Sequence, residues 1–380
     1  MIATVGIGIT RMPDKINRRA FLQATGILSA GLAFPRAQSL LAQGTRFGAW
    51  RTFEVTTRVE VLKPSGSTRI WLPTALTGET PYQKTLRDEY KLDGGTAKLI
   101  KRKTDFLGIL AAEFPPGVAP ILTLTSRVNT RDITADLAVK SGSNASRDEL
   151  QFCLRPTKLI PTDGIVRETA LEITRGATRD VDKARAIYDW IVENTARNPK
   201  TRGCGLGDIR FMLESGDLTG KCADLNALFV GLSRAAGVPA RDVYGVRTAP
   251  SRRGYKSLGA SSETVSTAQH CRAEVHLDGH GWVPVDPADV RKVMLEEPPG
   301  NRPIDDEMVR QARAALFGAW EMNYMAFNTA HDVELPGSKG PAVGYLMYPQ
   351  AETDGGRLDS LSPDTFQYEI TAKEIKPALP

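Results

Sequence analysis

The stretch from Thr219 to Pro239 constrains the fold of this chain more than any other. Its apolar residues recur at the helical spacing of i, i+3, i+4 and i+7. They are Leu225, Leu228, Phe229 and Leu232. Gly237 and Pro239 end the pattern, because glycine accepts a left-handed cap and proline cannot extend a helix. The pattern predicts one amphipathic helix whose first turn contains Cys222.

A cysteine at a helix start can have a chemical role. The unpaired N–H groups there carry partial positive charge, which favours the thiolate, the nucleophilic form of the side chain. A small buried residue on a core helix is the ordinary alternative, because free cysteines are often buried. A nucleophilic Cys222 therefore requires a base nearby.

A candidate base lies in the segment that holds three of the four histidines, residues 270–280. Residues 270–287 read as a β-hairpin, with two alternating runs joined by a glycine-containing loop. His270 falls on the polar face of the first strand, and the return strand ends at Asp286. A two-residue loop would place Asp289 opposite His270 instead. Cysteine, histidine and aspartate in this arrangement form a nucleophile, base and orienter set.

Three separated blocks resemble the transglutaminase-like superfamily, in order and in spacing. They are Gly220-Lys221-Cys222, Gly237-Val238-Pro239-Ala240-Arg241, and the hairpin from His270 to Gly281-Trp282-Val283-Pro284-Val285-Asp286-Pro287. The resemblance covers about residues 162–290. It implies an α+β fold, a papain-like core of helices packed on an antiparallel sheet. It also implies that Cys222 is the nucleophile, His270 the base and Asp286 the orienter.

One departure from the family pattern bears on the substrate. Many members follow the catalytic histidine with Ala-Trp, whereas this chain has Cys271-Arg272. We expect Arg272 to contact an acidic or carboxylate-bearing substrate, and Trp282 is a second candidate substrate contact. His331 and Asp332 are candidates for supporting the site, although a surface His-Asp pair is the ordinary interpretation.

The first 43 residues resemble a twin-arginine export signal. Arg18-Arg19 precede an apolar run too short to span a bilayer, and small residues near Ala37 or Ala42 suit cleavage. We therefore expect export, to the periplasm for example. Without these residues 44 basic and 43 acidic residues remain. This balance argues against nucleic acid or an anionic membrane as a partner.

Three further regions follow the signal. Residues 44–150 alternate with period two and predict an N-terminal β-sandwich-like domain with a linker. Residues 151–300 form the expected catalytic core. Residues 301–380 are expected to add a helix and strands that complete this core. The long loop at residues 245–267 is either a lid over the thiol or a surface loop.

We expect no metal and no cofactor, because the sequence lacks Cys-x-x-Cys and an acidic calcium loop. In an oxidising compartment Cys153, Cys204 and Cys271 could pair. Twin-arginine cargo generally folds before export, however, so no disulfide is required.

The expected chemistry is acyl transfer from an amide through a thioester. The Cys222 N–H and one upstream donor would bind the oxyanion. Hydrolysis of a protein, peptide or cell-wall peptide is preferred, because water needs no second binding site. Crosslinking of protein glutamine is the alternative within the same chemistry. A non-catalytic module that binds peptide or cell-wall material is the alternative of a different class.

Overall fold

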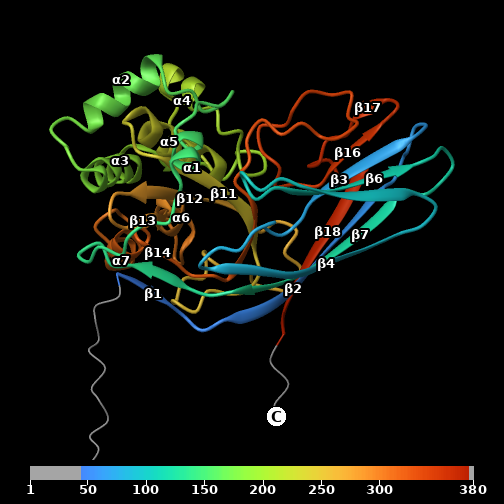
Figure 1. The fold of residues 1–380 in the computed structure, drawn as a ribbon, viewed down its shortest axis with the longest axis horizontal. Helices are drawn as coiled ribbons and strands as arrows, with labels where there is room; N and C mark the ends of the chain where they lie inside the picture. The colour runs from blue at the N-terminus through green and yellow to red at the C-terminus, as the bar shows by residue number, and fades with distance from the viewer. Residues whose placement is uncertain (1–43, 376–380) are drawn as a thin grey trace, which may run out of the picture. The chain divides into compact units, whose positions relative to one another are not determined.

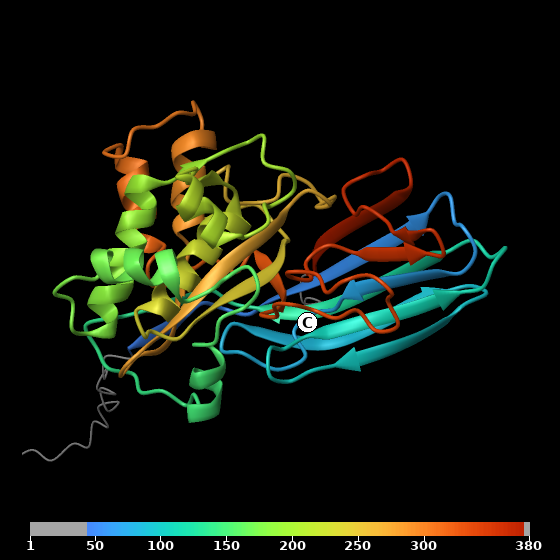
Figure 2. The same cartoon turned by 90° about the horizontal axis from the view of Figure 1, so that it is seen from above.

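A β-sandwich and a helix-rich core make up the part of the chain that the computed structural model describes, residues 44–375. The strands of the sandwich lie on one side of the molecule. The helices lie on the other side, around the separate sheet of the core (Figures 1 and 2). This architecture confirms the predicted α+β class. The predicted export signal at residues 1–43 lies outside the described residues.

The sandwich consists of two antiparallel sheets. One has the strand order β17-β16-β3-β6-β5 and the other the order β18-β2-β7-β4. Their strands are β2 (Arg51–Val61), β3 (Thr68–Pro73), β4 (Gln83–Leu92), β5 (Thr96–Lys101), β6 (Gly108–Phe114), β7 (Ile121–Thr130), β16 (Gln350–Thr353), β17 (Gly356–Arg357) and β18 (Phe366–Ile375). Alternate side chains of β2 are buried, as the period of two predicts. Apolar residues of both sheets form one cluster, which includes Val59, Ile70, Leu110, Leu122 and Phe366.

The strands after residue 350 differ from the expectation that they complete the core. β16 pairs with β3, and β18 pairs with β2 from Phe366 opposite Val61 to Ile375 opposite Thr52. Both therefore belong to the sandwich. A period of two identifies a strand but not its partner, so the sequence pattern could not assign these strands to a sheet.

The core is built on a four-stranded antiparallel sheet with the order β13-β12-β11-β15. Its strands are β11 (Ala240–Arg247), β12 (Gln269–Leu277), β13 (Gly281–Val285) and β15 (Tyr324–Asn328). The helices are α1 (Arg147–Phe152), α2 (Gly164–Ile173), α3 (Asp180–Asn194), α4 (Ile209–Ser215), α5 (Cys222–Ala235), α6 (Pro287–Glu296) and α7 (Glu307–Ala315). Short strands complete the described part: β1 (Thr45–Phe47), β8 (Ile133–Ala135) and β14 (Ala319–Trp320) in one sheet, and β9 (Ala196–Arg197) with β10 (Thr219–Gly220) in another.

Helix α5 begins at Cys222, which places this residue in the first turn as predicted, but the helix is buried on all sides rather than amphipathic. Its inner face packs on β11 and β12, and α2, α3 and α6 pack against it as well. Polar side chains on the helix are therefore buried too, and each needs a partner. Arg234, for example, donates to the carbonyl groups of Ala240 and Arg155.

The loop between β11 and β12, residues 248–268, is fastened to the sandwich. Val265 N–H donates to Ile370 O at 2.7 Å, and Ala372 N–H donates to Glu263 O at 2.8 Å. The Ser266 hydroxyl accepts from Ile370 N–H at 2.8 Å. Strand β18 thus holds a loop that belongs to the core.

Within residues 44–375, no helix has both the length and the apolar character needed to cross a membrane.

The buried packing of α5 gives a prediction about stability. Phe229 is 0% exposed on α5, and its replacement by alanine should lower the free energy of unfolding by about 3–5 kcal/mol. Phe211, on α4, is 65% exposed, so Phe211→Ala is a matched control with a small expected effect. Urea denaturation measures both. Equal losses in the two variants would contradict this view of the core.

Candidate active site

Cys222 begins α5 in a turn that is held by the carboxylate of Asp224. Oδ2 of Asp224 accepts the N–H of Lys221 at 2.9 Å. Oδ1 accepts the N–H groups of Leu206 and Gly207, each at 2.9 Å. One buried side chain therefore ties the helix start to the preceding loop and fixes the position of the thiol.

Two glycines make room for this carboxylate. A Cβ atom at Gly220 would lie 2.5 Å from Asp224 Oδ2, and one at Gly205 would collide with the same carboxylate. Gly205 also has a φ of +96°, which favours glycine. Gly220, two residues before Cys222, therefore allows both the turn and the close approach of the Asp224 carboxylate.

The imidazole of His270 lies between the Cys222 thiol and the Asp286 carboxylate. His270 Nε2 is 2.8 Å from Asp286 Oδ2, and the ring lowers the pKa of the Cys222 thiol through hydrogen bonding and charge. Because Nε2–H donates to Asp286, we assign Nδ1 as the nitrogen available to the thiol. All three residues are buried.

The hairpin has a three-residue loop, because Leu277 pairs with Gly281. Beyond β13 the chain turns into α6, and Asp286 is the N-cap residue of this helix: its Oδ1 accepts Asp289 N–H at 3.0 Å. Asp289 Oδ1 also reaches His270 Nε2, at 3.4 Å. The histidine thus faces both aspartates that the sequence offered as alternatives.

Arg247 balances the second carboxylate. Its Nη2 donates to Oδ1 and Oδ2 of Asp289 at 2.6 and 2.8 Å, and both side chains are buried. Burial and Arg247 each lower the pKa of His270, but the carboxylates of Asp289 and Asp286 outweigh them and raise it above its ordinary value. The imidazolium form of His270 is therefore favoured.

Two further thiols surround the Cys222 sulfur. Hydrogen bonds from Cys204 and Cys271 lower the pKa of Cys222 well below its ordinary value; burial opposes this effect and His270 adds to it. Cys204 has one S–H proton, which it can also donate to Gln269 O at 3.4 Å. All four cysteines of the chain are free thiols. A lowered thiol pKa and a raised imidazole pKa together favour a thiolate–imidazolium pair.

Cys222, Cys204 and His270 line a cavity of about 220 Å³, and the loop at residues 248–268 supplies part of its wall. The N–H of Lys221 is engaged by Asp224, and that of Ala223 donates to Cys204 O at 2.9 Å. The Cys222 N–H remains as the donor that could meet an oxyanion formed at the thiol.

Asn226 and Tyr324 support the histidine and its partner. Asn226, on α5, donates from Nδ2 to Asp286 Oδ1 at 3.1 Å and to Cys271 O at 2.8 Å. The Tyr324 hydroxyl lies 2.9 Å from His270 O. Sequence reasoning missed both residues, since a lone asparagine or tyrosine on a buried element carries no motif. The acidic residue three positions into the helix, Asp224, is a capping signal that could have been recognised.

Arg272 does not lie where a substrate contact requires. It is 3% exposed, its Nη1 donates to Glu321 O at 3.0 Å, and its guanidinium lies over the Tyr324 ring. Its Nε is 3.9 Å from Asp286 Oδ2. Both faces of β12 are covered, so a cation beside the histidine points into the core. The placement conflicts with the expected contact to an acidic substrate.

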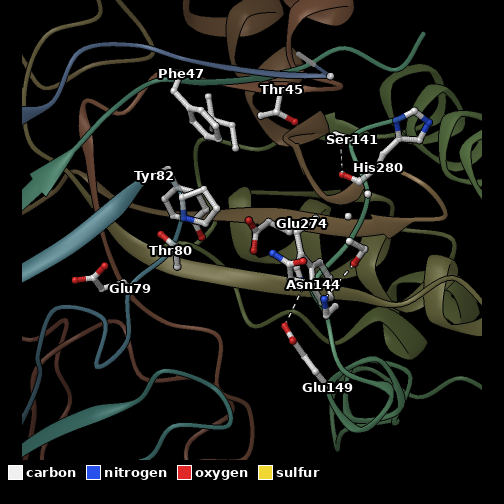
Figure 3. A pocket seen from close by; sticks show the side chains of 18 of the residues that line it. Thr45, Phe47, Glu79, Thr80, Tyr82, Ser141, Asn144, Glu149, Glu274 and His280 are labelled. Carbon is white, nitrogen blue, oxygen red and sulfur yellow. Dashed lines mark hydrogen bonds between the residues drawn. The ribbon is translucent and has the colours of Figure 1, made fainter. Parts of the chain in front are cut away.

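Trp282 lies at a different cavity, of about 810 Å³, between the hairpin and the sandwich (Figure 3). Its indole N–H donates to Glu149 at 2.9 Å, and the Arg241 guanidinium covers its ring at 3.9 Å. Arg241 also donates to Glu274 and Glu149, so these charged groups already have partners. The structure does not bring Trp282 to the thiol.

His331 and Asp332 line a third cavity, of about 520 Å³. His331 Nε2 is 3.2 Å from the buried carboxylate of Asp242, and Asp332 Oδ2 accepts Lys158 N–H at 2.9 Å. Neither residue is among those that line the Cys222 cavity. His331 is half-buried and Asp332 is exposed.

Donor atoms of His270, Asp286 and Asp289 lie within 4.8 Å of one another, a set that could in principle hold a metal ion. Each already has a charge partner, because Arg247 binds Asp289 and His270 binds Asp286. We interpret the set as an ion-pair network.

Residues 167–287 match the model of the transglutaminase-like superfamily. The chain contains a transglutaminase-like domain. A curated Haemophilus influenzae protein, described as uncharacterized, is 40% identical over 236 residues, which are 60% of this chain and 63% of that protein. The match thus spans less than two thirds of the relative.

Two solved structures resemble the chain at low identity. A Cytophaga hutchinsonii protein described as a candidate cysteine protease has a TM-score of 0.48 and 15% identity, covering 87% of this chain and 100% of its own. The periplasmic domain of TgpA from Pseudomonas aeruginosa has a TM-score of 0.32 and 14% identity, covering 68% and 92%. At these scores neither resemblance bears on the activity of this chain.

The thiol cluster predicts that Cys204 makes Cys222 more acidic. In Cys204→Ala the pH at which iodoacetamide alkylates Cys222 half-maximally should rise, because a hydrogen bond to the thiolate is lost. Cys204→Ser should shift it less, since the hydroxyl still donates. Mass spectrometry assigns the alkylated thiol. Cys153→Ala is the control, and an identical profile for all variants would show that Cys204 has no such role.

Proposed function

We propose that the chain is a cysteine acyl enzyme in which Cys222 is the nucleophile, His270 the base and Asp286 the residue that orients the base. The observation that supports this most is the His270 ring, which is bonded to Asp286 at 2.8 Å and lines the same cavity as the Cys222 thiol. The shifted pKa values of Cys222 and His270 agree with these roles.

The chemistry follows from the roles. The Cys222 proton moves to His270 Nδ1, and the thiolate attacks the carbonyl carbon of an amide. The oxyanion accepts a hydrogen bond from the Cys222 N–H. The His270 imidazolium then gives its proton to the departing amine as the C–N bond breaks, which leaves a thioester on Cys222.

Hydrolysis completes the cycle in the outcome we favour. Water gives a proton to His270 and attacks the thioester, which releases a carboxylic acid and restores the thiol. Transfer to an amine would use the same groups. Hydrolysis needs no second binding site, and the cavity at the thiol is small, about 220 Å³. We further propose that the protein is exported and acts on a protein, peptide or cell-wall peptide.

The test is to incubate the protein with peptide and peptidoglycan-fragment mixtures, with and without a fluorescent primary amine, and to weigh the products. We expect free acids, and a thioester adduct on Cys222 after acid quenching. Amine-linked products would identify a transferase. Absence of any product or adduct, with Cys222→Ala indistinguishable from the wild type, would favour a binding module.

Asp286→Asn should lower kcat by about tenfold or more with a smaller change in KM, because the residue orients His270 and does not contact the substrate. Asparagine is also a good N-cap residue, so α6 should remain intact. Asp278→Asn, in the exposed hairpin loop, makes the same change away from the site. A wild-type kcat in Asp286→Asn would count against the orienting role.

A further inference from the structure

The cavity at Cys222 is bordered by positive side chains. Its lining includes Arg197, Lys221, Arg247 and Lys292, and within the described part of the chain it includes no aspartate or glutamate. Such a surface attracts an anion and repels a cation.

The nearby carboxylates offset only part of this charge. Asp289 neutralises Arg247 through two hydrogen bonds. Glu296 is shared between two cations: it pairs with Arg197 and lies 3.3 Å from Lys292 Nζ. One of these two cations is therefore left without a carboxylate of its own.

Lys221 adds a second unbalanced charge. Among residues 44–375, no carboxylate lies within ion-pair distance of its ammonium group. It immediately precedes Cys222, so its position is fixed by the same turn that fixes the thiol. Lys292 is held nearby on α6, with its side chain 21% exposed.

Because both lysines line the space in front of the thiol, we propose that they bind a carboxylate of the acyl donor. The substrate class would be an acidic peptide, with the carboxylate beside the amide that Cys222 attacks. This inference rests on the proposed function and names its specificity. The two lysines take the role first expected of Arg272, contact with an acidic substrate, because the Arg272 guanidinium points into the core.

Two alkylating reagents of similar size test the charge directly. Iodoacetate is an anion and iodoacetamide is neutral; each forms a thioether with the Cys222 thiolate and releases iodide. The measured quantity is the rate of alkylation by iodoacetate divided by the rate with iodoacetamide. Mass spectrometry assigns the alkylation to Cys222. In Lys221→Met/Lys292→Met this ratio should fall about fivefold or more, since one positive charge about 4 Å from the iodoacetate carboxylate in water is worth about 1 kcal/mol.

Matched variants separate charge from damage to the fold. Lys221→Arg/Lys292→Arg retains both charges and should keep the wild-type ratio. Lys91→Met, on an exposed position of β4 in the sandwich, makes the same replacement elsewhere and should also keep it. Added salt should lower the wild-type ratio towards that of the double methionine variant.

Short peptides then locate the carboxylate. Acetyl-Ala-Glu-Ala-amide carries it on a side chain, acetyl-Ala-Ala at the C-terminus, and acetyl-Ala-Gln-Ala-amide is neutral. The acidic peptide that slows iodoacetamide alkylation more than the neutral peptide shows whether the site binds a side-chain or a C-terminal carboxylate.

The outcomes distinguish the two proposals. If Cys222 reacts readily but the rate ratio is the same in all variants, or if all three peptides protect equally, the specificity inference fails and the proposed function stands. If Cys222 reacts no faster than an ordinary buried thiol, the proposed function fails and the inference fails with it.

Discussion

The ion pair between Arg247 and Asp289 holds together the elements that surround His270. Arg247 lies at the end of β11, Asp289 lies in the first turn of α6, and Arg247 Nη1 also donates to Leu258 O in the intervening loop at 2.6 Å. Breaking a buried pair of this kind leaves an uncompensated charge, at a cost of about 3–5 kcal/mol. The pair therefore fixes the end of strand β11, the start of helix α6 and a loop relative to one histidine.

The thiol is positioned by a different means, through the backbone. Asp224 accepts three main-chain N–H groups, and this places Cys222 in front of His270 without any direct bond between the two anchoring systems. The systems meet at Asn226, which is on the thiol's helix and donates to the histidine's aspartate. Helix α5 thus carries both the reactive sulfur and a support for its base.

Much of this architecture could be predicted from the sequence, and the parts that could not have physical reasons. The helix at Cys222, the hairpin at His270 and the α+β class follow from periodicity and turn residues. The resemblance to the superfamily, whose model matches residues 167–287, added the order of Cys222, His270 and Asp286. Strand alternation placed Arg272 on a polar face, but both faces of β12 are buried, so the alternation did not report exposure.

Contacts between segments far apart in the sequence were the other feature that could not be predicted. Arg247 and Asp289 are 42 residues apart, and the sequence pattern around neither residue predicts the ion pair. Strands were expected within residues 301–380, but the partner of β18 is β2, at the opposite end of the described chain. Pairing over such separations depends on the whole fold.

The attachment of the 248–268 loop to β18 has a consequence for synthesis of the protein. The ribosome completes Cys222 and His270 well before it reaches the residues that hold one wall of their cavity in place. A nascent chain that has emerged only as far as α7 would carry the reactive sulfur with that wall unsupported. The cavity therefore reaches its final shape only after β18 has been translated and has paired with β2, which is synthesised long before it.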